Sequence, residues 1–224
     1  GSVLTNLGGT GAAYAVFGDN FSGVITQSGE KGVDLIQGTG AKNIVFAGSA
    51  DHTINLGTGI TYVNTGAGHD IINGLTVGSS GRNTIVYSAL NTHVFAGSGD
   101  ANTLWLQYDG THVNFVGGHV YTGFDIINLR PMQNMEGNSV TLDAAAVRDM
   151  TNINSHTHQH SMTINGDGHG TVNLVATDSW TSGAVLNGYT TFTSLNGAVI
   201  NVQNAVHVVF QPPAVPVTLD FALN

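Results

Sequence analysis

The chain of 224 residues contains no cysteine, which excludes disulfide bonds, thiol catalysis and cysteine-based zinc sites. Charge is also scarce: only 8% of the residues are Asp, Glu, Lys or Arg, against about 25% in an average protein. Five basic residues against fourteen acidic ones give a formal charge of −9. A nucleic-acid-binding protein needs clustered Lys and Arg for the phosphates, so we expect no nucleic-acid partner. No apolar run reaches the roughly 20 residues of a membrane span, so we expect no membrane insertion.

Glycine, by contrast, is abundant, with 31 residues, and much of it recurs at a fixed interval. Five short units open with a glycine nine or ten residues after the previous one, at Gly29, Gly38, Gly48, Gly57 and Gly66. Each unit continues into a short β-branched segment with one apolar anchor. The anchors are Ile36, Ile44, Ile54, Val63 and Ile72, followed after an insertion by Ile85, Val94 and Leu104. A helix would repeat its apolar positions every three to four residues, so this pattern predicts turns and strands.

The repeats predict an all-β fold, a parallel β-roll or β-solenoid with a β-rich C-terminal capping module. Each unit supplies one strand, and two units make one coil of about eighteen residues whose Ile and Val side chains stack into a core. A β-sandwich also has turns every 8–12 residues, but it does not normally repeat one local pattern through successive units. We assign residues 1–129 to the solenoid and residues 130–224 to a module that continues or caps it. Within the second segment, residues 141–150 have helix propensity.

The repeats resemble the hemolysin-type calcium-binding (RTX) nonapeptide, G-G-x-G-x-D-x-U-x, in which U is a large apolar residue. Residues 66–73 match this pattern best, and residues 32–36 and 97–100 match it in part. The resemblance implies a parallel β-roll with calcium held between the turns of successive coils. It also implies type I secretion and membership of large secreted bacterial toxins, proteases or adhesins.

For calcium, the resemblance implies carboxylates about eighteen residues apart along one edge, and Asp34, Asp51 and Asp70 keep such a spacing. The opposite edge carries Lys42, which would repel a cation, so we expect one or two calcium sites at most, on the edge of the three aspartates. An alternative is that each Asp only bonds its own turn backbone.

Three histidines alternate with other residues in the second segment, at His156, His158 and His160. On a strand, side chains at alternate positions share one face, so these imidazoles could bind zinc together. The alternative is an exposed polar loop, which the neighbouring Asn and Ser residues favour.

No nucleophile motif and no pair of catalytic carboxylates stands out, so we expect no enzymatic activity. The sequence favours a structural or adhesive module of a secreted or cell-surface bacterial protein, whose partners are a larger parent polypeptide, a second copy or a cell-surface glycan. Residues 162–190 resemble a β-module found beside RTX repeats in very large surface proteins. A carbohydrate-binding module is an alternative, with a platform formed by Trp105, Tyr108, Trp180 and Tyr189. A polysaccharide-active β-helix enzyme is a second alternative.

Overall fold

The computed structural model describes residues 5–6, 14–17, 24–26, 34–37, 42–46, 51–57, 59–76, 82–99, 101–133, 136–154 and 157–212. Before residue 51, the side chain of Val45 alone is described, and the other strand residues are described by their backbone. Within these residues the fold belongs to the all-β class, with three largely parallel sheets and one short α-helix.

The first sheet, sheet A, has eleven strands among the described residues. Its strands in spatial order are β1 (Thr5–Asn6), β2 (Tyr14–Phe17), β5 (Lys42–Phe46), β7 (Ile60–Asn64), β9 (Thr84–Val86), β11 (Thr103–Trp105), β14 (Ile126–Asn128), β16 (Ser161–Asn165), β20 (Val199–Gln203), β19 (Tyr189–Thr193) and β18 (Thr181–Leu186). Sheet B contains β13 (Tyr121–Thr122), β10 (His93–Phe95), β8 (Ile71–Asn73), β6 (His52–Asn55), β4 (Asp34–Gln37) and β3 (Val24–Thr26). Sheet C contains β12 (His112–Asn114), β15 (Ser139–Leu142), β17 (Thr171–Val175) and β21 (His207–Gln211).

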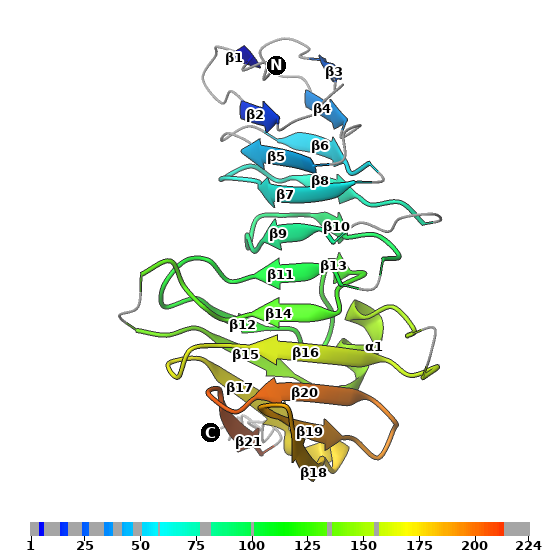
Figure 1. Ribbon diagram of the computed structural model, residues 1–224, viewed down its shortest axis with the longest axis vertical. Coiled ribbons are helices and arrows are strands. Elements are labelled where there is room, and N and C mark those ends of the chain that lie inside the picture. Colours follow the sequence, from blue (N-terminus) through cyan, green and yellow to red (C-terminus); the bar gives the residue numbers. More distant parts are fainter. Residues whose placement is uncertain are drawn as a thin grey trace, which may run out of the picture.

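The chain alternates between sheets as it advances along the long axis of the molecule (Figure 1). β4, β6, β8 and β10 lie in sheet B, and β5, β7 and β9, which come between them in the chain, lie in sheet A. Lys42 of β5 pairs in parallel with Ile60 of β7. Asp34 of β4 pairs in the same way with His52 of β6, at the same separation in sequence. Equivalent positions of successive repeats therefore lie side by side.

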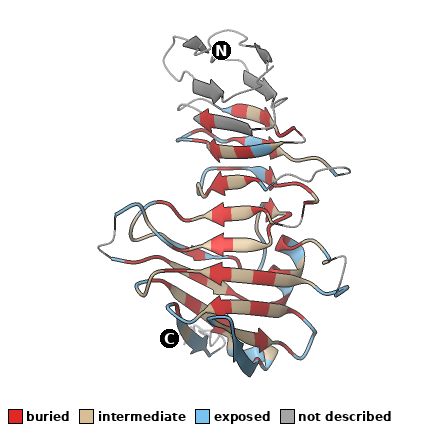
Figure 2. Cartoon of the chain, in the orientation of Figure 1, coloured by how far each residue is buried: buried red, intermediate tan, exposed pale blue. Residues whose placement is uncertain are grey.

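The core consists of in-register columns of apolar side chains. On the parallel strands of sheet A from β7 to β20, every second residue points inward and is at most 2% exposed, as Figure 2 shows by the alternation along each strand. The inward column of sheet A is Val45, Val63, Ile85, Leu104, Ile127, Ile164 and Val202. Ile54, Ile72 and Val94 form the matching column of sheet B. Burial of each such side chain contributes roughly 1.5–3 kcal/mol.

The predicted anchors from Ile54 to Leu104 are confirmed as buried. The prediction of Ile44 is wrong by one residue. Val45 is 2% exposed and pairs with the buried Val63, whereas Ile44 pairs with Tyr62. Because adjacent strand residues point to opposite faces, a shift of one residue exchanges the inward and outward sets.

The molecule broadens where sheet C begins, at the level of β12 and β15 (Figure 1). β13 is the last strand of sheet B among the described residues, and the helix α1 (Ala144–Met150) lies next to it. The N–H of Phe124, just after β13, donates to the carbonyl of Met150 at 2.7 Å. The paired residues of sheet A are now further apart in sequence, since Ile126 of β14 pairs with Thr163 of β16. Sheet A thus crosses residue 130, and both predicted segments contribute strands to it.

The predicted helix is confirmed within residues 141–150. Asp143 caps its first turn by accepting the N–H of Ala146 at 2.6 Å. Asp178, from the 3₁₀ helix η1 (Ala176–Asp178), accepts the N–H of Ala144, also at 2.6 Å. Alanine has the highest intrinsic helix propensity, which favours a helix here. One face of α1 is buried and consists of Ala144, Ala146, Val147 and Met150.

Candidate functional site

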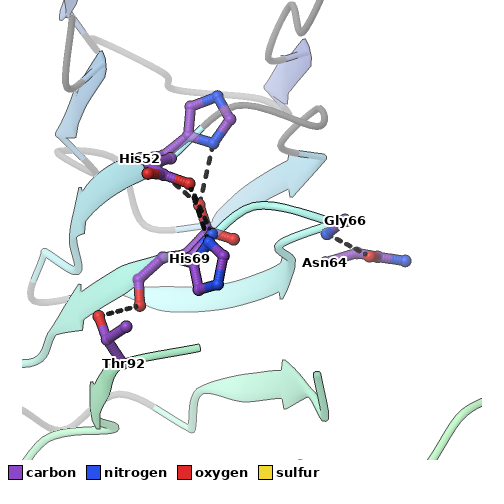
Figure 3. A network of polar contacts seen from close by, with 7 residues as sticks. His52, Asn64, Gly66, His69 and Thr92 are labelled. Atoms are coloured by element: carbon purple, nitrogen blue, oxygen red, sulfur yellow. Dashed lines mark hydrogen bonds and ion pairs between the residues drawn. The ribbon is translucent and has the colours of Figure 1, made fainter. Parts of the chain in front are cut away.

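Four ionisable side chains occupy the turns that lead into β6 and β8. Asp51 and His52 stand at the start of β6, and His69 and Asp70 immediately precede β8. Because these strands are in register, His52 lies beside Asp70 and Asp51 lies beside His69. Each turn carries one acid and one imidazole in the opposite order, so each of the two acids meets an imidazole. Figure 3 shows the two imidazoles, His52 and His69, in this arrangement.

The inner pair, His52 and Asp70, is fully buried, with both side chains 0% exposed. Oδ1 of Asp70 accepts the backbone N–H of His52 at 2.8 Å and lies 3.0 Å from its Nδ1. Oδ2 of Asp70 is also buried and has no hydrogen-bond partner among the described residues. The carbonyl of Asp70 accepts both the N–H of Thr92, at 3.0 Å, and its hydroxyl, at 3.3 Å. These bonds connect three successive turns of sheet B.

The outer pair, Asp51 and His69, is exposed to solvent, with side chains 66% and 63% exposed. Oδ1 of Asp51 accepts the backbone N–H of His69 at 2.8 Å and lies 3.5 Å from its Nδ1. The backbone N–H favours the charged carboxylate and lowers the pKa of Asp51 below its usual value. Solvent screening leaves such an exposed pair with little effect on stability.

For the predicted calcium edge, Asp70 is the described residue best placed to act as a ligand, because one of its oxygens is buried without a partner. The equivalent position on the preceding turn is His52, which offers nitrogen where calcium prefers oxygen. Asp51 lies on the outer side and is bound to His69. The side chain of Asp34 lies outside the described residues, although its backbone pairs with His52. Of the 6–8 oxygens that calcium takes, Oδ2 of Asp70 is the one buried carboxylate oxygen without a partner on the described part of this edge.

Three buried asparagines, which the repeat pattern did not single out, occupy the corresponding turns of sheets A and C. Asn83, Asn102 and Asn138 are at most 1% exposed. Nδ2 of Asn102 donates to the carbonyls of Gly97 at 3.0 Å, Gly99 at 3.1 Å and Gly123 at 2.9 Å. A side-chain amide thus lies at the centre of three converging carbonyl oxygens.

The oxygen of each asparagine amide binds the preceding turn. Oδ1 of Asn102 accepts the N–H of Asn83, and Oδ1 of Asn83 accepts the N–H of Thr61, both at 3.0 Å. Asn138 does the same beside sheet C: its Oδ1 accepts the N–H of Thr111 at 2.8 Å, and its Nδ2 donates to the carbonyl of Leu106 at 2.6 Å. These amides satisfy buried backbone groups that water cannot reach.

A sequence signal for these asparagines exists, because Asn83 and Asn102 each stand two residues before an inward anchor. Asn83 precedes Ile85, and Asn102 precedes Leu104, by the same interval that separates Asp70 from Ile72. Asparagine at the aspartate position of the repeat therefore marks a turn closed by an amide.

The predicted zinc residues do not lie on a strand in the described region. Ile153 and His160 form an isolated antiparallel bridge, and the N–H of His158 donates to the carbonyl of Asn154 at 2.8 Å, so the segment is a loop. Nδ1 of His160 lies 3.1 Å from the hydroxyl of Thr151. His156 lies outside the described residues. The loop interpretation therefore fits the described backbone better than the strand interpretation.

The predicted aromatic residues separate into different surroundings. Trp105 and Tyr108 lie close to Tyr62, which was not among the residues predicted for the platform. The rings of Tyr62 and Trp105 meet edge to face at 6.3 Å, and the hydroxyl of Tyr108 accepts a hydrogen bond from Nδ2 of Asn64 at 3.3 Å. Tyr189 lies on the same outer face of sheet A, whereas Trp180 is only 9% exposed and packs in the core cluster.

A residue beside Trp105 shows that the outer face is covered at this place. Val86 is in register with Trp105 and follows the inward-facing Ile85. It is nevertheless 1% exposed and does not belong to the core cluster. Side chains on the outer face therefore bury it, and the rings of Tyr62 and Trp105 lie on the two flanking strands.

A pocket of about 180 Å³ lies at the broad end of the molecule. It is lined by Val185, Thr190, Phe192, Val202, Gln203, Asn204, Val206 and Val208. None of these side chains ionises in the physiological range, so the pocket offers no acid, base or charged nucleophile.

Among the described residues, no group of three or more His, Asp or Glu side chains is arranged to hold a metal ion. Within the same part of the chain, no helix is both long and apolar enough to cross a membrane. Comparisons of the chain with protein-family models, with curated proteins and with solved structures found no match.

Proposed function

We propose that this chain is a non-catalytic structural and adhesive module of a secreted bacterial surface protein, built as a parallel β-solenoid with degenerate RTX-like repeats. The observation that supports the proposal most is the in-register parallel pairing of equivalent positions in successive repeats, from β4 to β6 to β8 and from β5 to β7. Such stacking buries a continuous core although no single repeat could bury its own apolar face.

The buried polar groups at the turns support a structural role. The amides of Asn102 and Asn138 form hydrogen bonds with backbone groups of neighbouring turns. A catalytic group must stay free to contact a substrate, whereas these amides are fully engaged inside the protein. A stack with internal bonds at its edges is suited to act as a stiff spacer or as a scaffold for an adhesive surface.

Calcium belongs to the proposal as a ligand of the edge that carries Asp34, Asp51 and Asp70. The buried and unpartnered Oδ2 of Asp70 supports it, and the histidine at position 52 opposes it. When bound, the ion would neutralise the carboxylates and join neighbouring turns. The asparagine-closed turns need no cation for that purpose.

Small-angle scattering and an activity assay test the proposal together. We expect an elongated particle whose maximum dimension stays the same in chelator and in calcium, because the apolar columns and the asparagine amides maintain the stack. We also expect no new reducing ends when the protein is incubated with soluble polysaccharides. A compact particle would contradict the solenoid, and released reducing ends would favour the β-helix enzyme instead.

A further inference from the structure

A column of polar and aromatic side chains runs along the outer face of sheet A, across five neighbouring strands. We name it the amide track; it consists of Trp105, Asn128, Asn165, Gln203 and Tyr189. The pairings Trp105–Asn128, Asn128–Asn165 and Gln203–Tyr189 are direct. Gln203 follows Val202, which pairs with Ile164, so it stands beside Asn165. With strands about 4.8 Å apart, the track is roughly 19 Å long.

Backbone N–H groups fix the orientations of two of the three amides of the track, Asn128 and Gln203. Oδ1 of Asn128 accepts the N–H of Arg130 at 3.1 Å, and Oε1 of Gln203 accepts the N–H of Gly166 at 3.0 Å. Backbone N–H groups can only donate, so these bonds identify the oxygen of these two amides. Oδ1 of Asn165 accepts the hydroxyl of Tyr189 at 2.8 Å. The NH₂ groups of all three amides have no hydrogen-bond partner among the described residues and lie on the outer face.

An aromatic ring stands at each end of the row of amides. The indole N–H of Trp105 donates to the carbonyl of Arg130 at 2.6 Å, and the hydroxyl of Tyr189 is bonded to Asn165. The polar atom of each ring is therefore held by the protein. Rings that are fixed before binding lose little entropy when a ligand stacks on them.

Arg130, one of five basic residues in the chain, lies along the same track. Its Nε donates to the carbonyl of Gly166 at 3.0 Å, and Nη2 lies 3.5 Å from Oε1 of Gln203. The guanidinium group has five N–H donors, so further donors stay available to a ligand. The track thus presents hydrogen-bond donors and one positive charge in a molecule of net charge −9.

A ligand for this surface must present oxygen acceptors at intervals near the strand spacing and apolar faces at its ends. An extended peptide does not fit, because it adds to the edge of a sheet, whereas the track lies on a face whose backbone groups are already paired. A protein partner does not fit either, because protein–protein interfaces are centred on large buried anchors, whereas the centre of the track consists of three amides. A chain of pyranose rings has oxygen acceptors in every unit, a unit length close to the strand spacing, and C–H faces that stack on aromatic rings.

We propose that the amide track binds a linear polysaccharide laid along the long axis of the molecule, with about four sugar units between Trp105 and Tyr189. The proposal rests on the adhesive role proposed above and assigns that role a ligand class and a site. The amide NH₂ groups donate to sugar oxygens, and Arg130 adds affinity for carboxylated sugars.

Isosteric substitutions test the proposal without removing the bonds that hold the track. Asn128→Asp and Gln203→Glu keep the oxygen that accepts a backbone N–H and replace the outward donor with an acceptor. Calorimetric titration uses two probes, cellohexaose as the neutral chain and hexagalacturonic acid as the carboxylated chain. We expect at least one probe to bind, with each substitution weakening affinity about fivefold and the double variant about 25-fold. A disaccharide of the same sugar should bind more weakly than the hexamer.

The matched control is Asn173→Asp on sheet C, which makes the same change of charge away from the track. Its Nδ2 donates to the hydroxyl of Thr141 at 3.3 Å. Affinity should be unchanged in this variant, and circular dichroism should show the same β-structure in all variants. Failure of both probes to bind the parent chain, or equal weakening by Asn173→Asp, would overturn the proposal. An elongated particle in scattering together with no sugar binding would overturn the track alone and leave the structural role standing.

Discussion

Replacing Asn102 by alanine should destabilise the protein by about 3 kcal/mol. The side chain is 0% exposed, donates to three carbonyls and accepts one N–H. The NH₂ group has two N–H bonds, which it shares among the three carbonyls, and the oxygen accepts one more hydrogen bond. Each buried hydrogen bond contributes about 1 kcal/mol net, so three bonds give the estimate. Nδ2 of Asn152 also donates to the carbonyl of Gly97, at 3.0 Å, which keeps that oxygen paired after the substitution.

Urea unfolding followed by circular dichroism measures the effect. Asn173→Ala is the control, because its side-chain amide donates a longer bond of 3.3 Å on the outer face and its loss should cost about 1 kcal/mol or less. A loss of less than about 1 kcal/mol for Asn102→Ala would refute the conclusion that the amide closes this turn.

Asn102→Asp separates the chemistry of the amide from its shape. A carboxylate has no N–H to offer, so it would face the carbonyl oxygens of Gly97, Gly99 and Gly123 without a donor between them. In chelator this variant should be at least as unstable as Asn102→Ala. Calcium should restore part of the loss, since the carboxylate and the three carbonyls together form an oxygen cage. The parent chain should show no such rescue at this turn.

Three further predictions concern metal ions and protons. If Asp70 holds calcium, adding the ion to chelator-treated protein at 100 times its dissociation constant should stabilise the protein by about 2.7 kcal/mol, and Asp70→Asn should abolish the gain. A melting temperature that does not respond to calcium would contradict the calcium edge. For the histidine loop the same titration uses zinc, with His158→Ala as the variant that should abolish the gain. Burial lowers the pKa of His119 below its usual 6.5, against the opposing effect of Asp149. The contribution of the neutral, buried His119 to stability should therefore be fully present above about pH 6.5 and be lost as the pH drops through the pKa of the folded state. His119→Phe, whose ring can keep the edge-to-face contact with Phe115, should flatten this part of the pH profile, and an unchanged profile would contradict the assignment.

The apolar pattern was sufficient to predict much of the fold. Ile54, Val63 and Ile72 recur at the repeat interval. This apolar periodicity is clear because every residue of the column must be apolar to be buried. The prediction of Ile44 is wrong because a second β-branched residue, Val45, follows it, and the local pattern does not decide which of the two points inward. Pairing with Val63 decides between them, and that pairing depends on a distant strand.

The polar site was predicted less well, since its contacts depend on register between turns. The spacing of Asp51 and Asp70 predicts one shared edge, but that spacing exceeds the strand register by one position, so the two side chains lie on different sides of the turn. Trp105 and Tyr62 meet diagonally across β9, a contact that no local pattern contains. The sequence around Trp180 does not distinguish an exposed tryptophan from a buried one, and tertiary packing buries it.

The reversed order of acid and imidazole in the turns before β6 and β8 also bears on how the stack assembles. In the native alignment Asp51 meets His69 and His52 meets Asp70. If β8 slipped by one residue in one direction, Asp51 would stand beside Asp70; in the other direction, His52 would stand beside His69. Either error sets like groups against each other and abolishes both attractive contacts. Four side chains thus distinguish one alignment from its nearest competitors while the chain is folding.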